Sequence, residues 1–215
     1  KINSKREIIG CFSAASNVTG IISDYKKIYV MMKRYGATVA FDAASLSPHD
    51  NLDADYFDAL FLSPHKLLGG VGSCGLLAIK KELVKSDKPT FAAGGTVSYV
   101  SRSSHFFAPS VEHTEEGGTQ HVMGLIRAAL AYRLRNEVGL DVIKSREDEL
   151  ARLFCEGMDK IPEVVSYCPR AVPRLPIFAF NVKGVSPYDF AEALSEAVKV
   201  IGLKRSEGGG GFGID

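Results

Sequence analysis

The chain has 215 residues, of which 46% are hydrophobic and 24% are charged, and its formal net charge is +1. This length fits one large domain or two small ones, with enough apolar residues to bury a core. A net charge near zero gives no reason to expect nucleic acid or an anionic membrane as a partner. No apolar run is long enough to span a bilayer.

The start of the chain, KINSKREIIG, has neither an initiator methionine nor the pattern of a signal peptide. We therefore expect it to begin inside a longer gene product. The cysteines are Cys11, Cys74, Cys155 and Cys168. They form no C-x-x-C pair and suggest no metal site, and scattered single cysteines fit a reducing compartment. We expect a cytoplasmic protein, with an organelle matrix not excluded.

Short apolar runs alternate with segments of helical spacing in the first eighty residues. A helix is expected at 24–36, with Gly36 as its C-cap. The alternation predicts an α/β fold with a mostly parallel sheet, flanked by helices on both faces. The expected buried strands are 6–12, 37–42, 55–63 and 75–81.

The second half of the chain predicts a small C-terminal α/β domain. Residues 84–118 are rich in Gly, Pro and Ser and are expected to form loops. We divide the chain into part of a large domain, 1–138, and part of a small domain, 139–215. The last residues, SEGGGGFGID, have too many glycines for packed structure. Expected elements are helices at 120–136 and 140–161, a strand at 175–182, and a helix at 186–198 with Ser186 as N-cap and Pro187 first.

Three polar side chains follow predicted strands or end them: Asn17, Asp42 and Lys66. Ligands of parallel α/β sheets bind at the carboxyl ends of the strands. We therefore expect these three groups to converge on one edge of the sheet.

Lys66 lies between an apolar strand and a run of apolar residues and glycines, in LFLSPHKLLGG. A lysine in an enclosed apolar site loses its proton more readily and can form a Schiff base with an aldehyde such as pyridoxal phosphate. A buried carboxylate such as Asp42 would hold the proton on the pyridine nitrogen of that cofactor. The alternative is that Asp42 caps a turn and Lys66 reaches solvent, and spacing alone leaves both open.

Other motifs fail on their context. GVGSCG, 70–75, matches the dinucleotide-binding pattern, but a strand follows it and position 95 is Gly where an acidic residue is expected. SPHK, 63–66, lacks the S-D-N and K-T-G motifs that accompany a nucleophilic serine. His113 and His121 are eight residues apart, which fits no known metal site, so we predict no metal.

The order of several segments resembles one family closely. SAASNVTGIISD, YGATVAFDAAS, ALFLSPHKLLGGVGSCGLLAIKK, AAGGTVSYV and EEGGTQHVMGLIRAALAY occur in this sequence. Together they resemble the class V aminotransferases, which are fold-type-I pyridoxal phosphate enzymes, and most of all the branch of cysteine desulfurases and selenocysteine lyases. The resemblance covers about residues 6–138 and weakens in the small domain. It implies a pyridoxal-phosphate-dependent transferase or lyase that acts on a small amino acid.

The resemblance also implies roles for single residues. Lys66 would carry the cofactor as an internal aldimine, and His65 would pack beside it and assist proton transfer. Asp42 would pair with the pyridine nitrogen, and Ala44 would press on the ring. Asn17 would bind near the ring hydroxyl or the substrate carboxylate.

The cofactor phosphate would be bound from two chains. Ser63 would contact it from the same chain, and the loop at Gly95–Thr96 would reach the cofactor phosphate of the other subunit. The resemblance therefore implies a homodimer, with no nucleic acid and no membrane among its partners.

The sequence also departs from the family pattern. Position 45 is Ser, where the desulfurases usually have Gln or His, and the N-terminal part of the family fold is missing. No cysteine follows Cys168, although desulfurases hold a catalytic cysteine on a late loop, and the expected substrate-binding arginine is also missing.

Three interpretations remain. The chain is a piece of a longer protein, or an aminotransferase or lyase that needs no cysteine, or a degenerate homologue kept as a structural or interaction subunit. The intact pair of Asp42 and Lys66 argues against the last, because an unpaired buried charge is costly.

Overall fold

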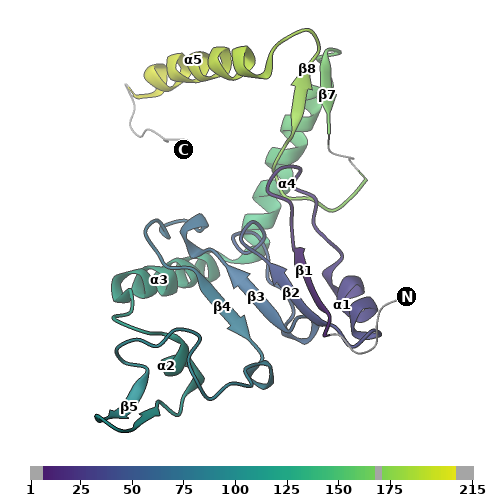
Figure 1. Cartoon of the computed structure of the whole chain (residues 1–215). Helices are drawn as coiled ribbons and strands as arrows, with labels where there is room; N and C mark the ends of the chain where they lie inside the picture. The colour runs from purple at the N-terminus through teal and green to yellow at the C-terminus, as the bar shows by residue number, and fades with distance from the viewer. Residues whose placement is uncertain (1–6, 168–170, 207–215) are drawn as a thin grey trace.

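The computed structural model describes residues 7–167 and 171–206, and it has two parts joined by a long helix (Figure 1). The larger part contains a four-stranded sheet, and the smaller part contains a two-stranded sheet and the last helix. Cys168 and the glycine-rich tail after Ser206 lie outside the described residues.

The main sheet has the strand order β1-β2-β3-β4. Its strands β1, β2 and β3 are parallel neighbours, and β4 pairs with β3 in the antiparallel direction. The expected α/β fold with a mostly parallel sheet is therefore confirmed. The strands are β1 (Ile9–Ser13), β2 (Thr38–Asp42), β3 (Ala59–Leu62) and β4 (Leu76–Ile79).

One face of this sheet packs on helix α1 (Tyr25–Lys33) to form the core. Phe41 of β2 is fully buried, and the Tyr25 ring meets it edge-on with the ring centres 6.0 Å apart. The helix begins at Asp24, whose side chain accepts a hydrogen bond from the N–H of Lys27. The helix ends at Lys33 with Arg34 as its C-cap, so the predicted C-cap at Gly36 is wrong. Gly36 instead lies in the turn that follows, with a φ of +68° that glycine tolerates.

The opposite face of the sheet is not covered as expected. This face carries Phe61, Leu77 and Ile79, and no described residue buries them. Leu77, for example, is 54% exposed. Cys11, expected to be buried, is exposed on the same face. Helix α3 (Val122–Val138) packs beside the turn that follows β3, so it leaves these side chains uncovered.

Residues 84–118 are not all loop, which corrects the sequence prediction. They contain an antiparallel hairpin of β5 (Val97–Val100) and β6 (His105–Phe107), and the short helix α2 (Val111–Glu115). The Tyr99 and Phe106 rings lie 6.0 Å apart across the hairpin. The serines that suggest loop lie in its turn, where the Ser101 hydroxyl accepts from the N–H of Ser104 at 3.0 Å.

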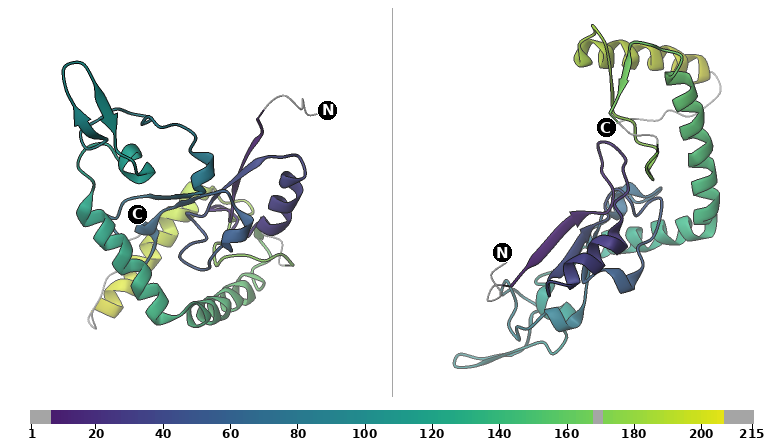
Figure 2. Two further views of the ribbon diagram at one scale, coloured as in Figure 1. Left: turned by 90° about the horizontal axis from the view of Figure 1, so that it is seen from below. Right: turned by 90° about the vertical axis from the view of Figure 1, so that its right-hand side faces the viewer.

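Helix α3 and helix α4 (Leu140–Met158) are separated by one residue, Gly139, whose φ is +89°. The chain turns sharply there, and α4 leads to the smaller part (Figure 2). The bend lies where the sequence divides the chain, at 138–139, although the domain division itself stays a prediction. The smaller part consists of β7 (Val164–Ser166), β8 (Phe180–Val182) and α5 (Pro187–Ser206).

The expected strand at 175–182 is shorter than predicted, and β7 was not foreseen. Only Phe180–Val182 pairs as a strand, with β7. Leu175 is instead buried in the core of the larger part, and its N–H donates to the Gly20 carbonyl at 2.8 Å. Its apolar side chain is thus used in the contact between the two parts of the molecule.

A buried carboxylate fixes the end of the sheet opposite to the carboxyl ends of β2 and β3. Asp58, just before β3, accepts hydrogen bonds from Lys33 Nζ at 2.8 Å, Lys80 Nζ at 3.0 Å and the Val39 N–H at 2.9 Å. The Tyr29 hydroxyl lies 3.2 Å from it. Burial raises the pKa of this carboxyl, but the hydrogen bonds from Lys33, Val39 and Lys80 outweigh burial and lower its pKa to about 2.

We expect Asp58→Asn to lower the free energy of unfolding at pH 7 by about 2 to 3 kcal/mol, because the lysine ammonium groups lose their counter-charge. Urea denaturation monitored by circular dichroism measures this difference. Glu137→Gln, which removes an exposed carboxylate 2.7 Å from Arg133, serves as the matched control and leaves the unfolding midpoint unchanged.

The Asp58 effect also has a defined pH dependence. The folded pKa of about 2 lies below the ordinary 3.8, so the stabilisation is complete above about pH 4 and is lost as the pH falls toward 2. The difference between the wild type and Asp58→Asn therefore shrinks over this range. A difference that stays constant down to pH 2 would contradict the proposed network.

Candidate functional site

The carboxyl ends of three parallel strands meet at one edge of the main sheet. Ser13, Asp42 and Phe61 are aligned as neighbours across β1, β2 and β3. Asn17 follows β1, and Lys66 follows β3 in a short 3-10 turn, Pro64–Lys66. Asp42 and the turn of Lys66 thus lie at the carboxyl ends of neighbouring strands, while the convergence of Asn17 with them stays a prediction.

Buried apolar neighbours hold the turn that carries Lys66. Pro64 and Leu67 are buried on either side of the exposed His65 and Lys66. The chain then passes close beneath the turn, because a Cβ atom at Gly70 would lie 1.9 Å from the Pro64 carbonyl oxygen. Only glycine fits there, which explains the glycine-rich sequence after Lys66.

Asp42 and Lys66 are linked through the loop that follows β2. The Asp42 carboxylate accepts a hydrogen bond from the N–H of Ala44 at 2.8 Å. The Lys66 amine lies 3.5 Å from the Ser45 hydroxyl. In the sequence, Ser45 stood out only as a departure from the family pattern. Its position three residues after Asp42 was the one sign that it lies near Lys66.

The expected enclosure of Lys66 is not observed. Asp42 and Lys66 are both exposed, and Asp42 also caps a turn, as the alternative interpretation held. The argument that an apolar enclosure makes the Lys66 amine lose its proton therefore does not apply to this exposed side chain. An amine that can attach an aldehyde and a carboxylate that can pair with a pyridinium nitrogen lie on the same sheet edge.

The remaining predicted residues on this edge offer polar groups. Ser63 precedes the turn of Lys66, is half-buried, and makes no hydrogen bond with its side chain to the turn. Ala44 is half-buried and Asn17 is exposed. These placements fit a bound cofactor with an apolar ring and a phosphate, although no described contact tests the individual roles.

The Asn17 loop is fixed by the segment that enters the smaller part. Gly20 has a φ of +75°, and a Cβ atom there would lie 2.8 Å from the Leu175 carbonyl and 2.9 Å from the Ile177 carbonyl. The N–H of Ile22 donates to the Pro173 carbonyl at 2.9 Å. The position of Asn17 therefore depends on residues about 155 positions later in the chain.

Thr96 is not part of this edge. The β5–β6 hairpin that it precedes lies at the other end of the larger part (Figures 1 and 2). Thr96 is fully buried, and its hydroxyl donates to the Ala93 carbonyl at 2.7 Å. Its side chain therefore stabilises the turn that contains Gly95, whose φ is +85°.

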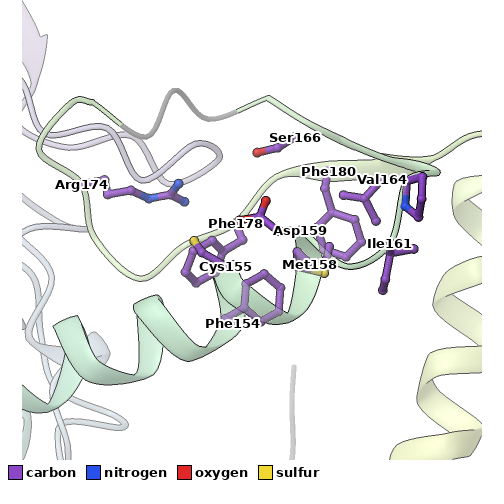
Figure 3. Close-up of a pocket in the computed structure, with 11 residues that line it drawn as sticks. Phe154, Cys155, Met158, Asp159, Ile161, Val164, Ser166, Arg174, Phe178 and Phe180 are labelled. Atoms are coloured by element: carbon purple, nitrogen blue, oxygen red, sulfur yellow. The ribbon is translucent and has the colours of Figure 1, made fainter.

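A cavity of about 240 Å³ lies in the smaller part, between α4 and β8 (Figure 3). Phe154 and Phe178 stack on one wall with ring centres 4.2 Å apart, and the Arg174 guanidinium lies 4.4 Å from the Phe178 ring centre. Cys155 and Asp159 also line it. None of the predicted site residues lines this cavity, so it is separate from the edge that carries Lys66.

Within the described ranges, no group of three or more His, Cys, Asp or Glu side chains is arranged to hold a metal ion. Across the same residues, no helix combines the length and apolar character that crossing a bilayer requires.

Comparison with known proteins identifies the family. A sequence model of class-V aminotransferases matches residues 1–204. The chain belongs to the class-V aminotransferase family. This family uses pyridoxal phosphate, and its cysteine desulfurase branch is the one that the chain resembles.

Curated relatives place the chain beside that branch. It is 33% identical to a probable cysteine desulfurase of Staphylococcus aureus over 202 aligned residues. The aligned region covers 93% of this chain and 48% of the relative. It is 31% identical over 184 residues to a probable cysteine desulfurase of Pyrococcus abyssi, covering 84% of this chain and 45% of the relative. The chain thus spans about half the length of the curated relatives it matches.

Solved structures give the same result for the fold. A cysteine desulfurase from Thermococcus onnurineus NA1 superposes with a TM-score of 0.79 at 29% identity, covering 88% of this chain and 48% of that one. The cysteine desulfurase CsdA from Escherichia coli gives a TM-score of 0.80 at 27% identity, covering 91% of this chain and 48% of that one. The fold is the fold-type-I architecture of pyridoxal phosphate enzymes.

Proposed function

We propose that this chain takes part in a pyridoxal-phosphate-dependent reaction on an amino acid, with the cofactor held on Lys66 as a Schiff base. The observation that carries the proposal is the placement of Asp42 and Lys66 at the carboxyl ends of adjacent parallel strands. Family membership supports it, because the family uses this cofactor. The resemblance to cysteine desulfurases favours cysteine or a similar small amino acid as substrate.

The residues of the sheet edge divide the binding of the cofactor between them. When bound, the cofactor supplies an electron sink for the amino-acid substrate. Asp42 holds a proton at the pyridine nitrogen, and Ala44 packs against the ring. The Ser63 hydroxyl binds the phosphate, and Asn17 binds the ring hydroxyl or the substrate carboxylate.

His65 precedes Lys66 and is exposed beside it. In this proposal its ring packs next to the cofactor and moves a proton to or from the substrate, a task suited to imidazole near neutral pH. We place the protein in a reducing compartment, the cytoplasm or an organelle matrix, because scattered single cysteines fit such a compartment.

We expect the full-length gene product to bind pyridoxal phosphate, to absorb in the near-ultraviolet to visible, and to carry the cofactor mass on Lys66 after borohydride reduction. Peptide mapping locates the label. Lys66→Ala abolishes it because the amine is gone, whereas Lys81→Ala, at a lysine 80% exposed, serves as control and leaves it unchanged. A label on another lysine would overturn the proposal.

We also propose that the active species is a homodimer in which Gly95–Thr96 lies near the cofactor phosphate of the partner subunit. The placement of this loop away from its own Lys66 edge favours a role in trans. Because the Thr96 hydroxyl is used within the loop, we assign it the task of shaping the turn at Gly95, whose backbone then faces the phosphate.

We expect Thr96→Val, which keeps the shape but removes the hydroxyl, to speed cofactor loss from the dimer about tenfold, because the turn loses the hydrogen bond from the buried Thr96 hydroxyl to the Ala93 carbonyl and keeps only the longer one from the Thr96 N–H. Thr96→Ser retains the hydroxyl and the wild-type rate. Dissociation of the cofactor is followed by absorbance, and assembly by sedimentation. A monomer that retains the cofactor as well as the wild type would refute the dimeric site.

A desulfurase must also carry sulfur on a mobile, accessible thiolate. Cys11 is exposed but lies within strand β1, and Cys74 and Cys155 are half-buried in a turn and in helix α4. A thiol held within a strand or helix cannot move to the substrate, accept its sulfur and then carry that sulfur away. We therefore propose that none of these three accepts sulfur, and the same expectation for Cys168 concerns a residue outside the described ranges.

We expect no persulfide on Cys11, Cys74 or Cys155 when the full-length protein is incubated with cysteine, since Cys11 lies within a strand, Cys155 within a helix and Cys74 is half-buried in a turn. Persulfide labelling and mass mapping test this. A persulfide on one of the four cysteines of this sequence would contradict it. Alanine formed without any persulfide favours a thiol-independent lyase, and no turnover by a cofactor-loaded protein favours the alternative of a structural or interaction subunit.

A further inference from the structure

Arg135, in the last turn of α3, is buried although arginine rarely is. Its residue is 8% exposed, and burial of a guanidinium is costly unless hydrogen bonds satisfy it. Its side chain donates to the Ser47 carbonyl, and to the Asn51 side-chain oxygen at 2.7 Å. The Tyr132 ring lies beneath it, 5.1 Å from the guanidinium carbon. Arg135 also donates to the Asn136 side-chain oxygen in its own helix at 3.3 Å, and its two hydrogen bonds outside α3 both go to one segment, the loop after β2.

That loop, residues 43–51, carries Ser45, whose hydroxyl lies 3.5 Å from the Lys66 amine. It begins directly after Asp42, and it contains Ala44 and Ser45. The loop is wound into successive turns, in which the Ser47 N–H donates to the Ala43 carbonyl at 2.8 Å and the His49 N–H donates to the Leu46 carbonyl at 2.8 Å. These hydrogen bonds connect the far end of the loop with its beginning at Ala43, next to Ala44.

A second contact anchors the same loop to the next helix. His49 Nδ1 lies 2.5 Å from Glu147 Oε1 of α4, and both side chains are 23% exposed. Gly139 alone separates α3 from α4. The loop is therefore contacted from both sides of this bend, by Arg135 of α3 and by Glu147 of α4. The loop is held at its far end by both helices and at its near end by the sheet.

We infer that Arg135 is a positioning residue for the cofactor site: it fixes the loop 43–51 so that Ala44 and Ser45 keep their places beside Lys66. This inference rests on the proposed function for its chemical meaning, but the clamp itself is a property of the cofactor-free chain. The planar guanidinium matters because it reaches the Ser47 and Asn51 oxygens at once, which a lysine ammonium on a flexible stem does not do with the same geometry.

Two variants test the clamp and one serves as control. Arg135→Lys keeps the charge but loses the fork, and Asn51→Ala removes one acceptor while leaving Arg135 in place. Arg133→Lys changes an exposed arginine on the same helix that pairs with Glu137. If Arg135→Lys fails to fold, Asn51→Ala decides the question, because Asn51 is exposed.

The first readout is amide hydrogen exchange of the cofactor-free, full-length protein. We expect residues 43–51 to exchange about tenfold faster or more in Arg135→Lys and Asn51→Ala, the factor that loss of one charge-assisted hydrogen bond gives. Exchange in α1 stays at the wild-type rate, and Arg133→Lys leaves both segments unchanged. Wild-type exchange of 43–51 in both test variants would overturn the inference.

The second readout uses protein loaded with pyridoxal phosphate. Arg135→Lys and Asn51→Ala lose the cofactor faster and change the pH dependence of its absorbance, while Arg133→Lys matches the wild type. Failure of the wild type to label Lys66 would refute the proposed function alone, since the exchange experiment does not need the cofactor. Labelling with faster loop exchange but an unchanged spectrum and cofactor retention would refute the positioning role.

Discussion

The parallel pairing of β1, β2 and β3 is the constraint on which the candidate site depends. Parallel strands in register end together, so the side chains that follow them meet at one edge. The alignment of Ser13 with Asp42 and of Asp42 with Phe61 brings the Asn17 loop, the Asp42 loop and the Lys66 turn to that edge. A shift of one residue in the pairing would turn Asp42 to the other face of the sheet.

Helix α1 supports the sheet that ends at this edge, and helices α3 and α4 contact the loop that follows Asp42. Helix α1 packs on the face that contains Phe41, and the Asp58 network holds the opposite end of the sheet through Lys33 and Lys80. Helices α3 and α4 do not cover the β4 side of the sheet, but their bend grips the loop after Asp42 through Arg135 and Glu147. The larger part is therefore organised so that its rigid contacts surround a polar edge without filling it.

The sequence was sufficient for those features that depend on local pattern. Short apolar runs predicted β1, β2 and β3, and helical spacing predicted α1, although the helix ends at Lys33, before the expected C-cap at Gly36. The placement of Asp42 and Lys66 at the same edge of the sheet followed from topology alone. The hairpin in 84–118 was missed because its serines satisfy a turn with their own side chains, which resembles loop in composition. The strand expected at 175–182 was too long because the burial of Leu175 comes from a contact with Gly20, far away in sequence.

The exposure of Lys66 and Asp42 shows that the sequence around a residue does not determine whether its side chain is enclosed. Apolar residues around Lys66 predicted an enclosed amine, but Pro64 and Leu67 bury themselves beneath the turn and leave the amine outside. Water hydrolyses the Schiff base that an aldehyde forms with an amine. A working site therefore excludes water from this edge. The relatives are about twice as long as the part they share with this chain, and their additional length is where a cover for the edge is to be sought. The sheet, the loop clamp and the Lys66 turn supply the positions of the reacting groups, and water exclusion is a separate requirement that they do not meet by themselves.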